Sequence, residues 1–134
     1  MSSPYDLFST DAKKETQGVE VDYGDFQITI ARASTANRKY QKVLAAKTKP
    51  IRRALSAGKA DPKRVVAIMR EVFAEAVVLG WKGVKGKDGK PLAFNKTNCV
   101  KLFTDLPEFF ADVQEQASGI ELFRDEELED DAGN

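Results

Sequence analysis

Hydrophobic and polar residues alternate in two short runs near the beginning of the chain. The first run, residues 19–23, places valine, valine and tyrosine between acids. The second, residues 26–30, places phenylalanine and two isoleucines around Gln27 and Thr29. A period of two on both sides of Gly24 and Asp25 predicts a β-hairpin. A lone hairpin is only marginally stable in water, so its apolar face is expected to cover another element.

Beyond the hairpin the apolar residues recur at steps of three and four, which is the period of a helix. Ser34 and Thr35 are candidate N-caps for the first helix, which Pro50 interrupts because proline removes a donor and disfavours helix before it. A short helical piece is expected from Ile51 to Ala57, since Gly58 then ends it.

The clearest helical pattern starts at Asp61 and Pro62, a carboxylate N-cap followed by proline at the first helical position. Apolar residues at positions 65, 69, 72, 76 and 79 form a stripe that positions 66, 73 and 77 widen. The pattern predicts a helix that runs to Gly80 with much of its circumference buried.

The glycine- and lysine-rich segment 80–91 raises the question of a phosphate-binding loop. Its spacing does not match the G-x-x-x-x-G-K-[ST] motif, because Gly86 and Lys87 are followed by a carboxylate, Asp88. The segment is therefore interpreted as a turn whose two arms lie side by side. Trp81 within it is interpreted either as a core anchor or as an anchor in a protein interface.

Two further helices are predicted in the C-terminal half. Asn95 or Thr97 caps the first, and Asp105 with Glu108 has the spacing of a capping box that opens the second, which ends near Gly119. The chain is thus expected to be mainly α with a small β-hairpin. This is an α+β fold in which an N-terminal hairpin is followed by about five helices in one compact domain with an acidic C-terminal tail.

The 134 residues are enough for one domain and too few for two. Residues 1–18 are interpreted as a flexible N-terminal arm, in which Leu7 and Phe8 are able to contact a neighbour. Residues 19–118 are assigned to a single mostly helical domain. Residues 119–134 are assigned to an acidic C-terminal tail.

The 21 basic and 21 acidic residues cancel in net charge but are unevenly distributed. Eleven bases and one acid fall between Arg38 and Arg70, whereas eleven acids and one base fall between Asp105 and Asn134. Such polarity indicates either a nucleic-acid-binding face beside an acidic tail, or oppositely charged surfaces that meet when copies or partners dock.

The side chains that most often carry catalysis or hold metals are scarce. The sequence has no histidine, which is the most common general base and metal ligand. The single cysteine, Cys99, lies beside apolar helical positions and is interpreted as a small core residue. No enzyme activity, cofactor or metal site is expected. The chain also lacks a run of eighteen apolar residues, so no membrane contact is predicted.

The basic segment 38–70 keeps one alternative open, a nucleic-acid-binding accessory protein. Its lysines and arginines could contact phosphates with release of counterions. However, aromatic residues such as Phe73 and Phe109 occupy apolar helical positions and are not interleaved with the bases, as a stacking platform would require. Nucleic acid is therefore the less favoured partner.

Three stretches resemble the tail assembly chaperones of long-tailed, siphovirus-type bacteriophages. VDYGDFQITIARASTANRKY, residues 21–40, is similar to the hairpin-then-helix opening of that family. GWKGV at 80–84 with DGKPLAF at 88–94 looks like its Trp-x-Gly-Val turn and its Asp-Gly loop. The ending ELFRDEELEDDAGN, residues 121–134, is the third. The resemblance covers most of residues 5–134, and its motifs are short and structural.

The resemblance implies a small, mostly helical protein made in the host bacterial cytoplasm and not expected in the mature virion. Such a protein binds the long, helical tape measure protein, keeps it soluble and helps recruit subunits of the tail tube protein. Members of this family are often made in two forms, the longer of which arises from a ribosomal frameshift.

The charge polarity then suggests which residues bind partners. A basic surface on one copy that faces an acidic surface on the next gives a head-to-tail homo-oligomer that need not close. Arg52 and Arg53 are the candidates on the basic side. Trp81 and the apolar residues Leu122 and Phe123, which lie outside the main helices, are the candidates for apolar contacts.

Overall fold

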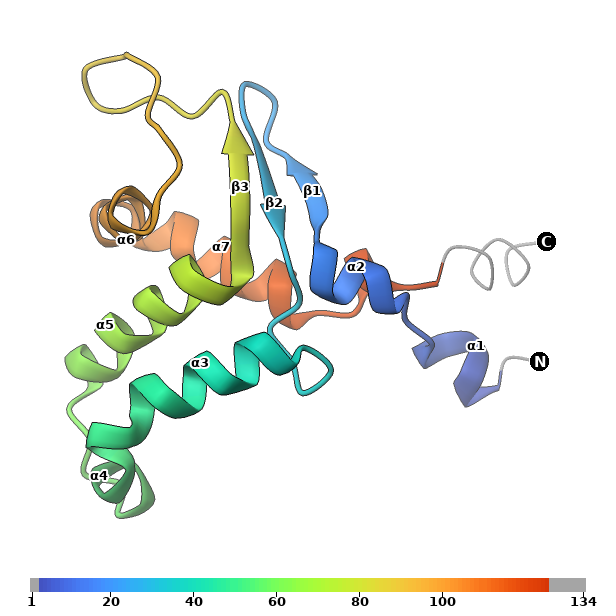
Figure 1. Cartoon of the computed structure of the whole chain (residues 1–134), viewed down its shortest axis with the longest axis vertical. Coiled ribbons are helices and arrows are strands. Elements are labelled where there is room, and N and C mark those ends of the chain that lie inside the picture. Colours follow the sequence, from blue (N-terminus) through green and yellow to red (C-terminus); the bar gives the residue numbers. More distant parts are fainter. Residues whose placement is uncertain (1–2, 126–134) are drawn as a thin grey trace.

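A three-stranded antiparallel sheet packed against helices organises residues 3–125, which the computed structural model describes (Figure 1). The strands are β1 (Val19–Asp22), β2 (Gln27–Ile30) and β3 (Val78–Lys82), in the order β1-β2-β3. The helices of the body are α3 (Arg38–Thr48), α4 (Arg52–Ser56), α5 (Pro62–Val72), α6 (Lys96–Asp105) and α7 (Pro107–Ser118). The predicted α+β class, mainly helical, is confirmed.

The predicted hairpin is present as β1 and β2. Val19 pairs with Ile30 and Val21 with Ile28, and Gly24 supplies the positive φ of the turn. Ile28 and Ile30 are both buried, so the apolar face of the hairpin covers the helical core as the alternation predicts.

The third strand was not predicted, because the sequence pattern extends the helix to Gly80. Helix α5 instead ends at Val72, a π-helical turn follows over Phe73–Val77, and the chain becomes extended at Val78. The Val78 N–H donates to the carbonyl of Phe73, and the Ala31 N–H donates to the carbonyl of Val77 at 2.8 Å. The apolar stripe fits a helix, but its β-branched residues are equally compatible with a strand. Pairing with β2 therefore decides in favour of the strand.

Two of the predicted helix caps are confirmed. Asp61 accepts from the Lys63 N–H at the start of α5, and Asn95 accepts from the Asn98 N–H at the start of α6. The cap of α3 is Asn37, not Ser34 or Thr35. The Asn37 side chain accepts from the Tyr40 N–H and donates to the carbonyl of Arg32, so it joins the helix to the end of β2.

The predicted capping box at Asp105 is wrong, because α6 continues through Asp105. Leu106 then leaves the helical region with φ −127° and ψ 76°, as expected for a residue before proline, and α7 begins at Pro107. Within the described chain no side chain caps α7. The two helices are consequently joined by a single non-helical residue.

The core lies between β2, the π-helical turn and the facing sides of α6 and α7. Edge-to-face contacts join Tyr40 to Phe73 and Phe73 to Phe110, and Phe110 lies against Phe103 at 4.7 Å between ring centroids. Cys99 is buried beside them, and this burial raises the pKa of its thiol to about 12. The interpretation of Cys99 as a core residue is confirmed.

Two short helices precede the sheet, α1 (Pro4–Phe8) and α2 (Ala12–Gln17), within the segment that the sequence assigns to a flexible arm. Helix α2 is packed, because Glu15 is only 5% exposed. The Glu15 carboxylate accepts from the Arg32 guanidinium at 2.7 Å and from the Thr10 hydroxyl at 2.6 Å. A buried ion pair thus fixes α2 to the end of β2.

The segment after α7 also packs, although the sequence assigns residues 119–134 to an acidic tail. A 3₁₀ turn, Glu121–Phe123, buries the Phe123 ring completely. The Asp11 N–H donates to the Phe123 carbonyl, and the Asp125 N–H donates to the Ser9 carbonyl. The two ends of the described chain therefore hold one another. The rest of the predicted tail, residues 126–134, lies outside the described residues.

Candidate protein-binding groove

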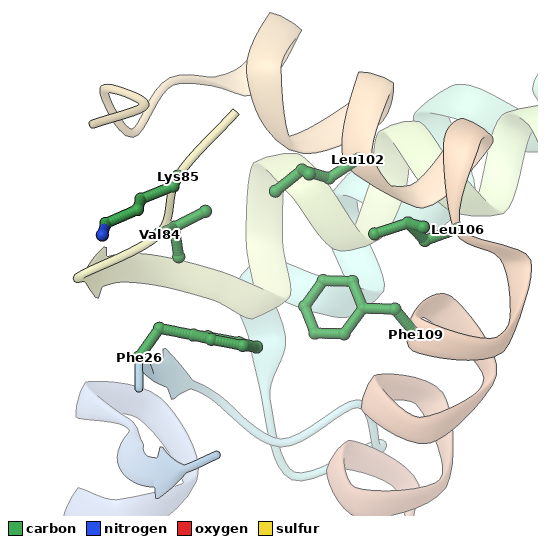
Figure 2. A pocket seen from close by; sticks show the side chains of 6 residues that line it. All are labelled: Phe26, Val84, Lys85, Leu102, Leu106 and Phe109. Carbon is green, nitrogen blue, oxygen red and sulfur yellow. The ribbon is translucent and has the colours of Figure 1, made fainter. Parts of the chain in front are cut away.

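An apolar groove opens at the hairpin-turn end of the sheet, where β3 leaves the sheet and α6 meets α7 (Figure 2). It has a volume of about 250 Å³. Of the six described residues that line it, five are apolar and one, Lys85, is charged. The lining residues are Phe26, Val84, Lys85, Leu102, Leu106 and Phe109.

The leucines of the groove come from the end of α6. Pro107 forces Leu106 out of the helix, so its side chain is not covered by a following helical turn and is 50% exposed. The Leu106 N–H donates to the carbonyl of Leu102, which places the two leucines one turn apart on the same side of the helix. Figure 2 shows both side chains facing the groove. An exposed leucine beside a hollow is an available apolar contact.

Aromatic rings form the wall between the hairpin and α7. Tyr23 stacks on Phe26 at 5.0 Å, and Phe109 meets both rings edge to face at 5.8 and 6.2 Å. The Tyr23 hydroxyl donates to the Asp112 carboxylate at 2.6 Å. Burial, and then the Asp112 carboxylate, raise the pKa of Tyr23 well above its ordinary value. This hydrogen bond from a neutral phenol to a carboxylate fixes the hairpin to α7 and so holds the wall in place.

The floor of the groove depends on Gly83. Its φ is +76°, and a Cβ at this position would lie 2.7 Å from the Asp25 carbonyl oxygen. Only glycine therefore allows the chain leaving β3 to pass so close to the hairpin turn. Val84 follows and is buried, while the Leu92 N–H donates to the Val84 carbonyl at 2.9 Å. The predicted side-by-side arms of this loop are confirmed.

Trp81 lies at the base of the same loop, outside the groove lining. Its indole N–H donates to the Leu92 carbonyl at 2.8 Å, and its ring meets Phe94 edge to face at 5.0 Å. It pairs with Ile28 across β2 and β3 and packs partly against the core. The structure therefore gives Trp81 a structural role in holding the loop that carries Val84. A direct role in partner binding stays a prediction.

Arg52 and Arg53 are both exposed, at the start of α4. They lie at the corner formed by α4 and the neighbouring ends of α3 and α5 (Figure 1), and neither lines the groove. Nine of the eleven bases between residues 38 and 70 are exposed, on α3, α4, the start of α5 and the segments that join them, namely Arg38, Lys39, Lys42, Lys49, Arg52, Arg53, Lys59, Lys63 and Arg64. We call these nine residues the basic surface.

The structure does not bring the five predicted partner-binding residues together. Arg52 and Arg53 belong to the basic surface, Trp81 supports the loop, and Leu122 and Phe123 lie in the C-terminal turn. Phe123 is 0% exposed, so it is a core residue and offers no surface to a partner. Leu122 is half-buried against the core.

Sequence reasoning missed the groove because its lining comes from three segments far apart along the chain. The sequence did contain one sign that Leu106 lies between two helices. A residue directly before a proline such as Pro107 is disfavoured in a helix, so it ends one helix without entering the next. The helical periodicity instead treats Leu102 and Phe109 as ordinary core positions.

Comparison with known proteins adds a family. No curated protein and no solved structure gives a significant match to the chain. No helix within residues 3–125 is long and apolar enough to cross a membrane. The sequence model of the YdaY prophage protein family matches residues 35–134. This range includes the basic surface, β3 and every groove residue except Phe26. Because the match spans well over half of the chain, the protein belongs to the YdaY prophage protein family and is of phage origin.

Proposed function

We propose that this prophage protein is a tail assembly chaperone that binds the tape measure protein, keeps it soluble and helps recruit tail tube protein. The observation that carries the proposal is the apolar groove with its half-exposed Leu106. Phage origin, from the family match, and the resemblance of residues 21–40, 80–84, 88–94 and 121–134 to tail assembly chaperones support it. The protein acts by binding, in the host bacterial cytoplasm, and is not an enzyme or a part of the mature virion.

The chemistry of the groove fits an amphipathic helix. A long helical client presents apolar side chains at steps of three and four residues, and a groove lined by leucine and aromatic side chains covers such a stripe. Coverage removes apolar surface from water and from other client chains, which suppresses aggregation. Lys85 at the rim favours client segments in which acids flank the apolar stripe.

Many copies are needed to cover a long client. The basic surface provides a contact between copies, because the exposed Arg52 and Arg53 at the start of α4 attract acidic segments of a neighbour. A contact between two different surfaces repeats without closing, so it suits an extended client.

Co-expression with the candidate tape measure protein tests the function. The wild-type chain should keep the client soluble and co-purify with it, whereas the Leu106→Ser variant should lose both effects. Leu55→Ser is the matched control, because Leu55 is 41% exposed on α4, far from the groove lining. Equal client solubility with Leu106→Ser and with the wild type would contradict binding in the groove.

The nine exposed bases of the basic surface favour one second candidate, a nucleic-acid-binding accessory protein. Binding of labelled single-stranded and duplex oligonucleotides at low and high salt tests it. Steep loss of binding with salt, together with no effect on client solubility, would support this candidate. Absence of binding at low salt would exclude it.

A further inference from the structure

Helix α1 carries the two most exposed large apolar side chains among residues 3–125, Tyr5 and Phe8. Tyr5 is 81% exposed, Phe8 67% and Leu7 43%, and none of its five residues is buried within residues 3–125. The helix is nevertheless well formed, since the Asp6 N–H donates to the Ser3 hydroxyl and the Ser3 N–H donates to the Asp6 carboxylate. A single capped turn is too short to be stable through its own hydrogen bonds. Helix α1 therefore requires a packing partner for its apolar side chains.

The apolar groove is a surface that could cover α1. It cannot do so within one copy, because α1 and the groove lie at opposite ends of the sheet. The carbonyl of Ser9, directly after α1, accepts a hydrogen bond from the Asp125 N–H. Thr10 pairs with Arg124 in an isolated antiparallel β-bridge. This anchor lies at the end of the sheet where β1 begins and β2 ends. The groove lies at the other end, because its lining residue Phe26 directly follows the hairpin turn. Figure 1 shows that turn and α1 at opposite ends of the sheet. With its base fixed in this way, α1 meets a groove only on a second molecule.

We propose that α1 of one copy packs into the apolar groove of a second copy and links the copies head to tail. The rings of Tyr5 and Phe8 fill a hollow of about 250 Å³ whose lining is apolar at five of six described positions. The charges also match, since Asp6 is the only charged side chain from residue 3 to residue 8 and Lys85 is the charged residue of the groove. Because the two contacting surfaces differ, each added copy leaves one helix and one groove free for the next.

This inference goes beyond the proposed function, although it places the chain's own helix in the groove proposed for the client. Self-association and client binding then compete for one surface. A variant that weakens α1 frees the groove, so its affinity for the client stays the same or rises. A variant that damages the groove loses both.

Cysteine cross-linking tests the contact directly. Two full-length variants, Phe8→Cys and Leu106→Cys, are purified separately, mixed and oxidised, so that a disulfide between the new cysteines joins only different molecules. We expect a cross-linked heterodimer in high yield. The native Cys99 is buried and contributes little. Leu55→Cys replaces Leu106→Cys in the control mixture, and an equal yield from the control would overturn the proposal.

Sedimentation velocity of the full chain provides the second measurement. The double variant Tyr5→Ser with Phe8→Ser should weaken self-association about tenfold or more, and Leu106→Ser should do the same, because each removes one side of the contact. Phe94→Ser, at an exposed residue outside both the groove lining and the basic surface, should associate like the wild type. An unchanged mass distribution for the double variant, or a wild-type chain that is monomeric at every concentration, would overturn the proposal.

Client binding separates this inference from the proposed function. If the Tyr5→Ser with Phe8→Ser variant is monomeric and still co-purifies with the tape measure protein, both proposals stand. If it associates normally while Leu106→Ser loses the client, the α1 contact is wrong and the client-binding role survives. If α1 cross-links into the groove but no variant affects the client, the proposed function is wrong and the self-contact stands.

Discussion

The two ends of the sheet differ in what they bury. At the end where β1 begins, the Glu15–Arg32 ion pair and the Phe123 ring join α2, β2 and the C-terminal turn. The Arg32 guanidinium also lies 5.9 Å from the centre of the Phe123 ring. At the hairpin-turn end, Leu106 is half-exposed beside an apolar hollow. The first end is closed and stabilises the fold, whereas the second is open and available for binding. This difference predicts that substitutions at the two ends have separable effects.

The largest effect is expected at Phe123, on the closed end. Phe123→Ala should lower the free energy of unfolding by about 3 to 5 kcal/mol, because it leaves a cavity where a fully buried ring packed. Chemical denaturation monitored by circular dichroism measures the loss. Phe94→Ala is a control, since Phe94 is exposed and its replacement should cost much less. A stable Phe123→Ala variant would mean that the C-terminal turn does not close this end.

The next largest effect is expected at Glu15. Glu15→Gln should destabilise the fold by about 2 kcal/mol, because the charged hydrogen bond from Arg32 is replaced by a weaker one in a buried position. Thermal unfolding should show a lower midpoint for this variant than for Glu20→Gln, whose carboxylate is exposed on β1. Equal midpoints would indicate that the ion pair contributes little to the closed end.

Tyr23 provides a pH-dependent test at the open end. Its folded-state pKa is raised, so its contribution to stability is fully present below the ordinary value of about 10 and is lost as the pH rises further. Tyr23→Phe should cost about 1 kcal/mol at neutral pH, through the lost hydrogen bond to Asp112. It should also weaken the alkaline loss of stability, measured by unfolding at pH 8 to 11. Tyr5→Phe, at an exposed tyrosine, should leave the stability at neutral pH unchanged.

A smaller effect on stability is expected at Leu106, despite a complete effect on binding. Leu106→Ser should change the free energy of unfolding by less than about 1 kcal/mol, because half of the side chain is already in water. Measuring unfolding and client co-purification on the same preparation makes the comparison sharp. If the Leu106→Ser variant failed to fold, Leu106 would be a core residue and not part of a binding surface.

The smallest effect on folding is expected on the basic surface. Arg52→Glu with Arg53→Glu should leave stability within about 0.5 kcal/mol of the wild type, since both side chains are exposed. Self-association should weaken in a salt-dependent manner, because charge attraction between copies is screened. Unchanged self-association and unchanged client binding would show that the basic surface has no part in either.

The features predicted correctly from the sequence are those that short segments specify by themselves. The hairpin follows from the alternation around Gly24, and the starts of α5 and α6 follow from Asp61 and Asn95. Strand β3 was missed because Val78 and Leu79 fit both a helical stripe and a strand, and contact with distant β2 decides between them.

The C-terminal turn and the groove were missed for related reasons. The acids that follow Phe123 made residues 119–134 look like a solvated tail. The Phe123 ring is nevertheless buried, by contacts with residues more than 80 positions away in the sequence, such as Arg32. The groove joins Phe26, Val84 and the α6–α7 junction, and no local pattern reports such a meeting. Its one local sign was the leucine before Pro107.

The π-helical turn at Phe73–Val77 has a mechanical consequence. Helix α5, this turn and β3 follow one another directly, so one continuous element runs from the basic surface at Lys63 to Lys82, two residues before Val84 in the groove. The turn is buried at four of its five residues and hydrogen-bonded to the chain after β2, which gives it little freedom to bend. We therefore expect a displacement of α5 to shift the segment that carries Val84, because the turn between them has no room to absorb it.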